Sequence, residues 1–412
     1  MHDNCYKQLV LKKDILLLQG PVGPFFKHFA DYLISKGASV FKINFHYGEQ
    51  FFFKSKESTL YRGSVEEWHN YLIKILHQKQ IKQVFMIGKH KIYHQIAVEL
   101  CNKLNIQVFV FEEGYIRSGY ITIEENGVNG DTSLPKDPNI YFQWNNQGYL
   151  EPPESTTLNI AARYFNHWKY YYLYSWGLFI SQWLIPNYRH HLPAKGWRNF
   201  FKWNKFFWKL PFVTLFPFAK EKNSLWTYRN INKYYIAILQ INTDSAVTQY
   251  SQYAHMEEFI HDTIKSFADN APKDTKLMIK HHPFDRGIHC YKAYIENLTQ
   301  QYGIKDRVLY LIDIHLNMAF ENSRGCLVIN STAGFAALSH QIPTIALSPQ
   351  AIYNLPGLTN QCSLDEFWRK NEAPDQVLLA KFRSYLVYHT QMRGCFYGGV
   401  ICDFHRKFIF EE

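Results

Sequence analysis

The sequence lacks the cysteine spacing that would build a disulfide framework or a zinc site. Its seven cysteines are odd in number and scattered, and no two of them form a C-x-x-C pair. Disulfide-rich domains and zinc sites need cysteines in regular, paired spacings. The distribution therefore favours a protein of the reducing cytosol. The opening residues, MHDNCYKQLVLKKD, also lack the apolar core and small-residue cleavage site of a secretory signal.

Several motifs of nucleotide and metal chemistry are missing as well. No stretch matches a Walker loop or G-x-G-x-x-G, so ATP and dinucleotide binding lose support. There is no Asp-x-Asp pair and no His/Cys cluster with the spacing of metal ligands. We therefore expect no metal and no cofactor. A sugar diphosphate handled through a chelated divalent ion is not suggested, and a monophosphate-linked donor fits better. A run of about 18 apolar residues is also absent, so a membrane-spanning helix is not expected.

Acidic residues are absent from one long window, residues 155–220, which holds nine lysines and arginines. The chain carries a net charge of +10, and this window accounts for nearly all of the excess. Six of the ten tryptophans also lie there. Interleaved rings and basic side chains suit the headgroup region of an anionic membrane. The alternative is an aromatic helical hairpin packed on the domains, and a nucleic-acid surface is disfavoured because no binding motif accompanies the charge.

Short apolar runs alternate with amphipathic stretches on both sides of this window. Before it, strands are expected at 15–20, 39–45, 83–88 and 108–114, with helices near 25–36, 64–79 and 91–104. After it, strands are expected at 236–240, 276–283, 308–313, 326–330 and 343–348. This alternation predicts parallel α/β sheets.

The length of 412 residues allows two domains with separate cores. We therefore expect an α/β protein with two Rossmann-like domains and a basic aromatic helical region between them. The predicted bounds are 1–150 for the first domain, 151–230 for the helical region and 231–412 for the second domain. Ligands are expected at the carboxyl ends of the strands, in a cleft between the domains.

The first candidate for catalysis follows the run VFVF, where Glu112 and Glu113 end the strand and a glycine comes next. Successive side chains of a strand point to opposite faces, so at most one of the two carboxylates easily reaches a cleft. We choose Glu113 as the catalytic carboxylate and regard Glu112 as a neighbour that contacts substrate. The alternative is a structural role, in which the two carboxylates interact with the positive charge of Arg117 or with a helix N-terminus.

Two further candidates lie in the second block. In IKHHPFDRG, His282 is held extended by Pro283, and with Asp285 and Arg286 it follows a predicted strand. Its imidazole could donate to a phosphate or act as an acid. In VINSTAGFAAL, the polar residues Asn330, Ser331 and Thr332 open a helix, and a helix N-terminus is an anion site.

A fourth candidate is the glycine- and proline-rich turn QGPVGPFF, which begins with Gln19 and Gly20. Glycine allows the backbone to approach a ligand closely. The turn therefore predicts contact with an acceptor or a sugar, and a plain tight turn between strand and helix is the alternative.

Five motifs, in this order, resemble the capsule polysaccharide biosynthesis and export family of KpsS and LipB. They are QGPVGPFF, FEEGYIRSGYIT followed by GVNG, IKHHPFDRG, NSTAGFAAL and IYNLPGLT. FEEGYIRS also resembles the EDGF-x-RS segment of the related KpsC proteins. The resemblance extends over both α/β blocks, and the length is similar to the single-module KpsS type.

The resemblance implies a GT-B-like retaining β-Kdo transferase. Such an enzyme takes Kdo from CMP-Kdo and starts the capsule linker on a phosphatidylglycerol-type lipid, at the inner face of the bacterial inner membrane. A peripheral location there is implied, with an anionic phospholipid surface, a KpsC-type transferase and the capsule ABC-transporter complex as partners. No nucleic acid is expected.

The resemblance also implies roles for single residues. Glu113 matches the acidic residue before glycine and is assigned as nucleophile, while His282 and Pro283 match a motif that contacts the CMP phosphate. Ser331 and Thr332 match the helix start that holds this phosphate, and Arg117 is a partner for the Kdo carboxylate. The alternatives are a non-catalytic scaffold for capsule export and a transferase that uses another CMP-activated acidic sugar.

Overall fold

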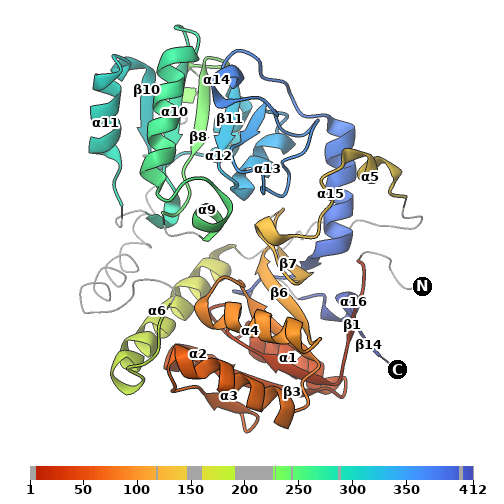
Figure 1. Cartoon of the computed structure of the whole chain (residues 1–412). Coiled ribbons are helices and arrows are strands. Elements are labelled where there is room, and N and C mark those ends of the chain that lie inside the picture. The colour runs from red at the N-terminus through yellow and green to blue at the C-terminus, as the bar shows by residue number, and fades with distance from the viewer. Residues whose placement is uncertain are drawn as a thin grey trace. The chain divides into compact units, whose positions relative to one another are not determined.

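The computed structural model describes residues 6–116, 119–145, 160–190, 226–227, 229–242, 245–285, 289–398 and 402–411. The chain divides into two compact units, each with its own sheet and core (Figure 1). The first unit comprises Met1–Ser133, Asn146–Phe207 and Ser384–Glu412, and the second comprises Leu134–Asn145 and Trp208–Arg383. The last residues of the chain therefore pack in the first unit.

The first unit contains a seven-stranded sheet with the order β13-β7-β6-β5-β2-β3-β4. Its strands are β2 (Asp14–Leu17), β3 (Ser39–Asn44), β4 (Ser58–Leu60), β5 (Gln83–Ile87), β6 (Gln107–Glu113), β7 (Tyr120–Glu125) and β13 (Gln391–Arg393). The strands from β6 to β4 are parallel, whereas β7 and β13 are added antiparallel at one edge. A separate two-stranded sheet pairs β1 (Leu9–Leu11) with β14 (Phe408–Phe410).

Helices cover both faces of the seven-stranded sheet. They are α1 (Phe25–Ser35), α2 (Tyr47–Phe52), α3 (Val65–Gln78), α4 (Ile92–Lys103), α6 (Ile160–Leu184) and α16 (Phe404–Lys407), with a 3-10 turn at Asn129–Asp131. On one face, Phe85 and Phe111 of the sheet cluster with Phe29 of α1 and with Phe408. The rings of Phe29 and Phe111 meet edge to face at 5.4 Å, an arrangement that aromatic pairs prefer. Part of the high aromatic content therefore fills this core.

Helix α6 runs beside α2 (Figure 1). The two helices pack closely because glycines meet at their crossing: a Cβ atom added to Gly177 would lie 2.3 Å from the backbone nitrogen of Gly48. The expectation of a helical region after residue 151 can be followed only over 160–190, since 151–159 and 191–225 lie outside the described residues. Within the described part of the chain, no helix has the length and apolar character needed to cross a bilayer.

The second unit contains a five-stranded parallel sheet with the order β10-β9-β8-β11-β12. Its strands are β8 (Tyr234–Ile238), β9 (Lys276–Lys280), β10 (Val308–Leu311), β11 (Gly325–Val328) and β12 (Thr344–Ala346). Its helices are α5 (Pro138–Gln143), α9 (Ser245–Tyr250), α10 (Met256–Asn270), α11 (Lys292–Gln301), α12 (Leu316–Glu321), α13 (Thr332–Ser339), α14 (Leu364–Phe367) and α15 (Gln376–Thr390), which continues past Ser384. Single 3-10 turns lie at Pro283–Asp285 and Lys305–Arg307.

Alternation along β8 places its side chains in two separate cores. Tyr235 and Ala237 face a buried cluster with residues of α10, α11 and α14. Tyr234 points the other way, and its hydroxyl donates to the carbonyl of Ala319 in α12 at 2.6 Å. Helices on both faces of a parallel sheet are the layers of a doubly wound α/β domain.

The predicted α/β class is confirmed. Each of the nine expected strands coincides with a strand of the structure, and all nine take part in parallel pairs. The antiparallel strands β7 and β13 were not expected. They extend the first sheet beyond β6, the strand that carries the two glutamates.

Candidate functional site

Strand β6 ends in Glu112 and Glu113, and the strand places them on opposite faces of the sheet. Phe109 and Phe111 lie in the core with α1, and by alternation Glu113 shares their side. The Glu113 side chain is exposed, whereas Glu112 is partly buried. The carboxyl end of a parallel strand therefore presents one carboxylate to solvent and holds the other closer to the protein.

The surroundings of Glu113 include two phenols. Burial raises the pKa of both Tyr171 in α6 and Tyr397, and the negative charge of Glu113 raises each pKa further. The two hydroxyl oxygens are 3.5 Å apart. Both hydroxyls consequently keep their protons at neutral pH and can donate hydrogen bonds close to the carboxylate.

The turn after Glu113 is held by close packing and by a hydrogen-bond network. A Cβ atom on Gly114 would lie 2.4 Å from the Tyr120 carbonyl oxygen, so this position requires glycine for space. The Thr122 hydroxyl donates to the Glu113 carbonyl at 3.0 Å, and the Gln391 amide of β13 donates to the Thr122 hydroxyl at 3.0 Å. The added antiparallel strands thus fix the position of the glutamate pair.

A buried ion pair lies at the carboxyl end of β3, on the same carboxyl edge of the sheet. The Lys42 ammonium is 3.4 Å from Glu49 Oε2, and His46 Nε2 is 3.3 Å from Glu49 Oε1. Burial alone would raise the pKa of Glu49, but the Lys42 ammonium, and after it the contact with His46, hold the pKa below its usual value. Glu49 is therefore ionised at neutral pH.

The ammonium of Lys91 interacts electrostatically both with Glu49 of this ion pair and with Glu112 at the end of β6. Burial lowers the pKa of its ammonium to about 8, while the negative charges of Glu49 and then Glu112 act in the opposite direction. Lys91 precedes α4 and follows β5, so it belongs to the same carboxyl edge. The edge thereby combines a carboxylate at Glu113 with a cation suited to an anionic ligand.

Gln19 reaches this cluster through the hydroxyl of Tyr174 in α6. The Gln19 amide donates to the hydroxyl at 3.2 Å, and His46 Nε2 lies 3.0 Å from it. Gly20 follows, and a Cβ atom there would meet the Phe26 ring at 2.6 Å. Close packing against Phe26 therefore accounts for the glycine at position 20. Gln19 contacts a helix from the basic aromatic region.

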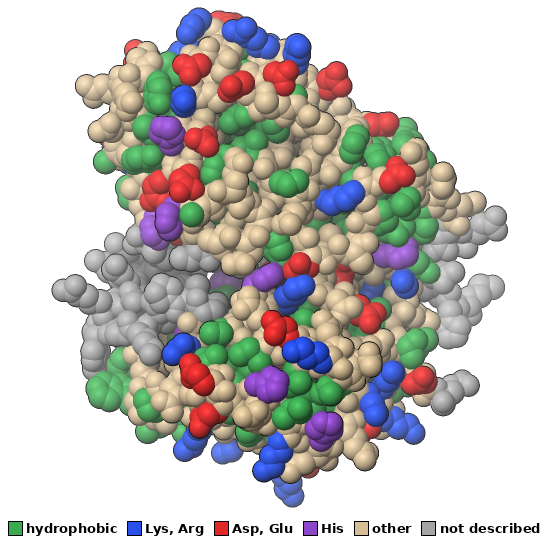
Figure 2. All heavy atoms as spheres, in the orientation of Figure 1, with side chains coloured by type: hydrophobic (Ala, Val, Ile, Leu, Met, Phe, Trp, Pro, Cys, Tyr) green, Lys and Arg blue, Asp and Glu red, His purple; other side chains and the backbone are tan. Residues whose placement is uncertain are grey.

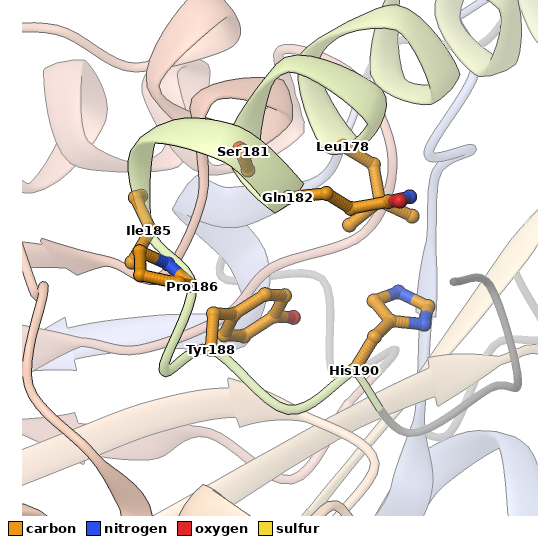
Figure 3. Close-up of a pocket in the computed structure, with 7 residues that line it drawn as sticks. All are labelled: Leu178, Ser181, Gln182, Ile185, Pro186, Tyr188 and His190. Carbon is orange, nitrogen blue, oxygen red and sulfur yellow. The ribbon is translucent and has the colours of Figure 1, made fainter. Parts of the chain in front are cut away.

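A cavity of about 170 Å³ adjoins the cluster at the end of α6. Its lining combines polar and apolar side chains: Leu178, Ser181, Gln182, Ile185, Pro186, Tyr188 and His190. Figure 3 shows Gln182 and Tyr188 extending toward His190. His190 Nε2 is 3.5 Å from the Tyr174 hydroxyl, so hydrogen-bonding groups run from Gln19 to the cavity wall.

The second unit brings two of the predicted motifs to the carboxyl edge of its sheet. The amide of Gln240, just past β8, donates to Asn330 Oδ1 at 2.9 Å, and the Asn330 backbone N–H donates to Gln240 Oε1 at 3.1 Å. The Ser331 hydroxyl accepts from the Ala333 backbone N–H at 3.2 Å and caps α13. Thr332 begins the helix. This reciprocal pair holds the start of α13 beside the end of β8.

The His-Pro segment follows β9 on the other side of β8. His281 is buried, with its Nδ1 2.8 Å from the Tyr310 hydroxyl, whereas His282 is partly exposed. Pro283 is exposed and opens the 3-10 turn that contains Asp285. The carboxylate of Asp285 accepts from the Asn242 backbone N–H at 3.2 Å, and burial raises its pKa. His282 is thus the histidine of the pair that is partly open to solvent.

A family model described as "Capsule polysaccharide biosynthesis protein" matches residues 82–397. The chain belongs to this family. The "Capsule polysaccharide export protein KpsS" of Escherichia coli is 32% identical over 399 residues, which cover 96% of this chain and 100% of that protein. The "Capsule polysaccharide modification protein LipB" of Neisseria meningitidis serogroup B is 31% identical, covering 97% of this chain and 95% of that protein. This capsule polysaccharide biosynthesis protein is therefore of the KpsS/LipB type.

Solved structures resemble this capsule protein more distantly. The Thermosulfurimonas dismutans protein described as "KpsC, beta Kdo 2,7 transferase" has a TM-score of 0.46 and 12% identity. That match covers 94% of this chain and 95% of the other. The calicheamicin glycosyltransferase CalG4 has a TM-score of 0.34 and 13% identity, with 92% and 94% covered.

The structure places most of the predicted site residues at strand ends, in two groups. Glu112, Glu113, Gln19 and Gly20 lie at the edge of the first sheet, and His282, Pro283, Asp285, Asn330, Ser331 and Thr332 at the edge of the second. Arg117 and Arg286 lie outside the described residues. Among the residues that the structure describes, no three His, Cys, Asp or Glu side chains are grouped so that they could hold a metal ion.

Four residues beside the first group were not anticipated: His46, Glu49, Lys91 and Tyr174. Glu49 lies in the short helix α2, His46 directly precedes this helix, and neither residue belongs to a recognisable sequence motif. Tyr174 stands among many similar tyrosines in α6. Of the four, only Lys91 could have been found from the sequence. It follows the predicted strand 83–88 closely, and ligands of an α/β sheet bind at the carboxyl ends of its strands.

Proposed function

We propose that this capsule polysaccharide biosynthesis protein is a retaining β-Kdo transferase with a GT-B-like arrangement. It transfers Kdo from CMP-Kdo to a phosphatidylglycerol-type lipid and so begins the capsule linker. The observation that carries the proposal is the position of Glu113, an exposed carboxylate at the carboxyl end of β6, in a chain of this family. The motif FEEGYIRS, which resembles a KpsC segment, supports the choice of donor.

In the proposed reaction, Glu113 attacks the anomeric carbon of Kdo. A bond forms between a carboxylate oxygen and this carbon, and the bond to the CMP phosphate oxygen breaks, so that CMP leaves with its electron pair. A hydroxyl of the lipid headgroup then attacks the same carbon and displaces Glu113, which leaves as a free carboxylate, and the hydroxyl proton passes to water. Two inversions give net retention, as in other enzymes with a carboxylate nucleophile.

The other predicted residues receive supporting roles. His282 and Pro283, with Asp285 and Arg286, contact the donor phosphate or assist its departure, and Asn330, Ser331 and Thr332 hold it at the start of α13. Arg117 pairs with the Kdo carboxylate, while Gln19, Gly20 and Glu112 contact substrate. No metal is required, because a monophosphate-linked donor does not need a chelated divalent ion.

The proposed setting is the inner face of the bacterial inner membrane, where the protein acts peripherally. Its partners there are an anionic phospholipid surface, a KpsC-type transferase and the capsule ABC-transporter complex. The basic, aromatic composition of residues 155–220 supports the first of these partners. The family membership supports a place in capsule assembly.

A transfer assay tests the proposal directly. The folded protein is incubated with freshly generated CMP-Kdo and a fluorescent phosphatidylglycerol analogue, and mass spectrometry reads the mass of one added Kdo. We expect a singly modified lipid. A product with CMP-sialic acid but none with CMP-Kdo would refute the donor, and no product with either donor or with a Kdo-primed acceptor would favour an export scaffold.

Lys91 predicts a pH dependence of substrate binding. Since burial lowers its pKa to about 8, the ammonium that attracts an anionic substrate is present below this pH and is lost above it. We expect the KM of the wild type to rise as the pH increases through about 8. Lys91→Arg should keep the lower KM at higher pH, because a guanidinium remains charged there.

Steady-state kinetics between neutral and mildly alkaline pH check this expectation. Lys91→Met should raise KM about tenfold at neutral pH, the loss of a modest ionic contact. The matched control is Lys89→Met, since Lys89 is a lysine two residues earlier in the chain whose ammonium pairs with Asp131 at 3.0 Å. Equal effects of the two substitutions would show that general surface charge, not the position of Lys91, governs binding.

A further inference from the structure

Helix α6 has two faces with different surroundings. The inward face packs on α2: the Ser181 hydroxyl accepts from the Tyr47 backbone N–H at 2.8 Å, and Gly177 lies against Gly48. Tyr174, on the same inward face, joins the cluster of Gln19 and His46. This face is therefore fixed within the first unit.

The outward face carries a continuous row of aromatic rings. Ring centroids are 6.0 Å apart for Phe165 and Trp168, 5.8 Å for Trp168 and Tyr172, 6.3 Å for Tyr172 and Trp176, and 6.2 Å for Trp176 and Phe179. Trp183 continues the row one turn later. We call these six residues the α6 stripe. Their spacings of three and four keep all of them within about 60° of a single line along the helix.

Much of the α6 stripe is exposed despite its size. Phe165 is 60% exposed, Trp176 41% and Trp183 68%, and the neighbouring Ile180 and Leu184 are exposed as well. The stripe spans about 27 Å from its first to its last residue, at a rise of about 1.5 Å per residue. Figure 2 shows hydrophobic side chains in green over the lower end of α6 as Figure 1 draws it. The other three rings, those of Trp168, Tyr172 and Phe179, are partly exposed. Large apolar side chains exposed along one side of a helix mark an interaction surface.

The composition around the stripe indicates a lipid rather than a protein partner. Tryptophan and tyrosine dominate over leucine and isoleucine, and such amphipathic rings favour the depth of lipid headgroups. Lys169 is exposed beside the stripe, and no acidic residue occurs in the whole of residues 155–220. A long basic side chain next to such rings can bury its methylenes and keep its charge at anionic headgroups.

We propose that the α6 stripe is the surface by which this protein docks on an anionic lipid bilayer, with α6 lying in the plane of the headgroups. The aromatic side chains enter the interface, while the opposite face of the same helix stays on α2 and keeps Tyr174 in its cluster. The inference deepens the proposed function, because it names the surface that brings a lipid acceptor to the first unit. It does not depend on the donor, since docking is measured without any sugar nucleotide.

Vesicle flotation of the full chain tests the proposal, with vesicles of phosphatidylglycerol and phosphatidylcholine and with vesicles of phosphatidylcholine alone. We expect the wild type to float with the anionic vesicles, and its binding to fall with added salt. The double variant Trp176→Ser with Trp183→Ser should lower the partition coefficient at least about tenfold, because each lost ring removes a large apolar contact. Both residues are exposed, so the variant should keep the wild-type unfolding transition.

The control is Phe142→Ser, which removes an aromatic ring of similar exposure, 45%, from α5 in the second unit. We expect it to bind vesicles as the wild type does. Wild-type protein that fails to float, or a stripe variant that floats unchanged, would overturn the proposal. The proposal would also be overturned if analytical ultracentrifugation found a dimeric wild type and a monomeric stripe variant, because the stripe would then be an interface between two copies. Transfer activity without vesicle binding would refute the docking surface alone, and vesicle binding without transfer would leave it standing.

Discussion

Glu113→Gln is expected to abolish Kdo transfer, with a loss in kcat of at least about a thousandfold, because the amide cannot act as the nucleophile. The substitution keeps the shape of the side chain. The Glu113 side chain is exposed, so the variant should fold with the stability of the wild type. The measurement is the single-turnover rate with CMP-Kdo and the fluorescent lipid.

The adjacent Glu112 provides the matched control. It lies on the other face of β6, and its negative charge opposes the lowering of the Lys91 pKa, whereas its effect on the pKa of Tyr171 is smaller than that of Glu113. Glu112→Gln should therefore raise KM while leaving kcat within about tenfold of the wild type. Rapid quenching of the wild-type reaction should show a peptide around Glu113 with the added mass of one Kdo. If Glu112→Gln removes the activity and Glu113→Gln does not, the assignment is reversed, and if neither substitution changes transfer, a carboxylate nucleophile at this strand is excluded.

The parallel strands could be predicted because each is recognisable from its own residues. A run such as QVFMI, buried on both faces, needs no partner to be recognised as a strand, and its flanking turn residues define its ends. The strand from Tyr120 to Glu125 is different, because its polar residues Thr122 and Glu124 are buried. Alternation of apolar and polar residues normally indicates that the polar face is in contact with solvent. The sequence of this strand alone therefore does not reveal that both of its faces are buried.

The burial of those polar residues depends on hydrogen-bond partners outside the strand, one of them remote in the chain. Thr122 accepts a hydrogen bond from Gln391, and the carboxylate of Glu124 accepts one from the Tyr115 hydroxyl at 2.8 Å. A separation of 269 residues divides Thr122 from Gln391, so no local pattern reveals the pair. The placement of Glu112 and Glu113 could be anticipated because it follows from strand alternation alone. The cluster of His46, Glu49 and Tyr174 could not, because it forms only when α6 packs on α2.

Glu49→Gln is expected to destabilise the protein by about 3 to 5 kcal/mol, the usual cost of removing one partner from a buried ion pair. Lys42 is 2% exposed, and besides Glu49 its ammonium donates to the Ile43 carbonyl at 2.7 Å. Burial lowers the pKa of Lys42, and the carboxylate opposes this shift. Without the carboxylate, the fold must hold an uncompensated buried ammonium or release its proton. Urea unfolding at neutral pH measures the loss.

The pH dependence distinguishes this electrostatic cost from a packing defect. In the wild type, the pKa of Glu49 is held below its ordinary value of 4.5, so its contribution to stability is complete above that pH and is lost as the pH falls toward 2. In Glu49→Gln, the lowered pKa of Lys42 means that stability should recover as the pH rises, since the neutral amine is tolerated in the core. The double variant Lys42→Met with Glu49→Gln should regain most of the lost stability at neutral pH, because both charges are gone. A deficit in the single variant that is independent of pH, or a double variant that is less stable still, would show that packing of α2 against its neighbours, and not the Lys42–Glu49 pair, holds this edge of the sheet together.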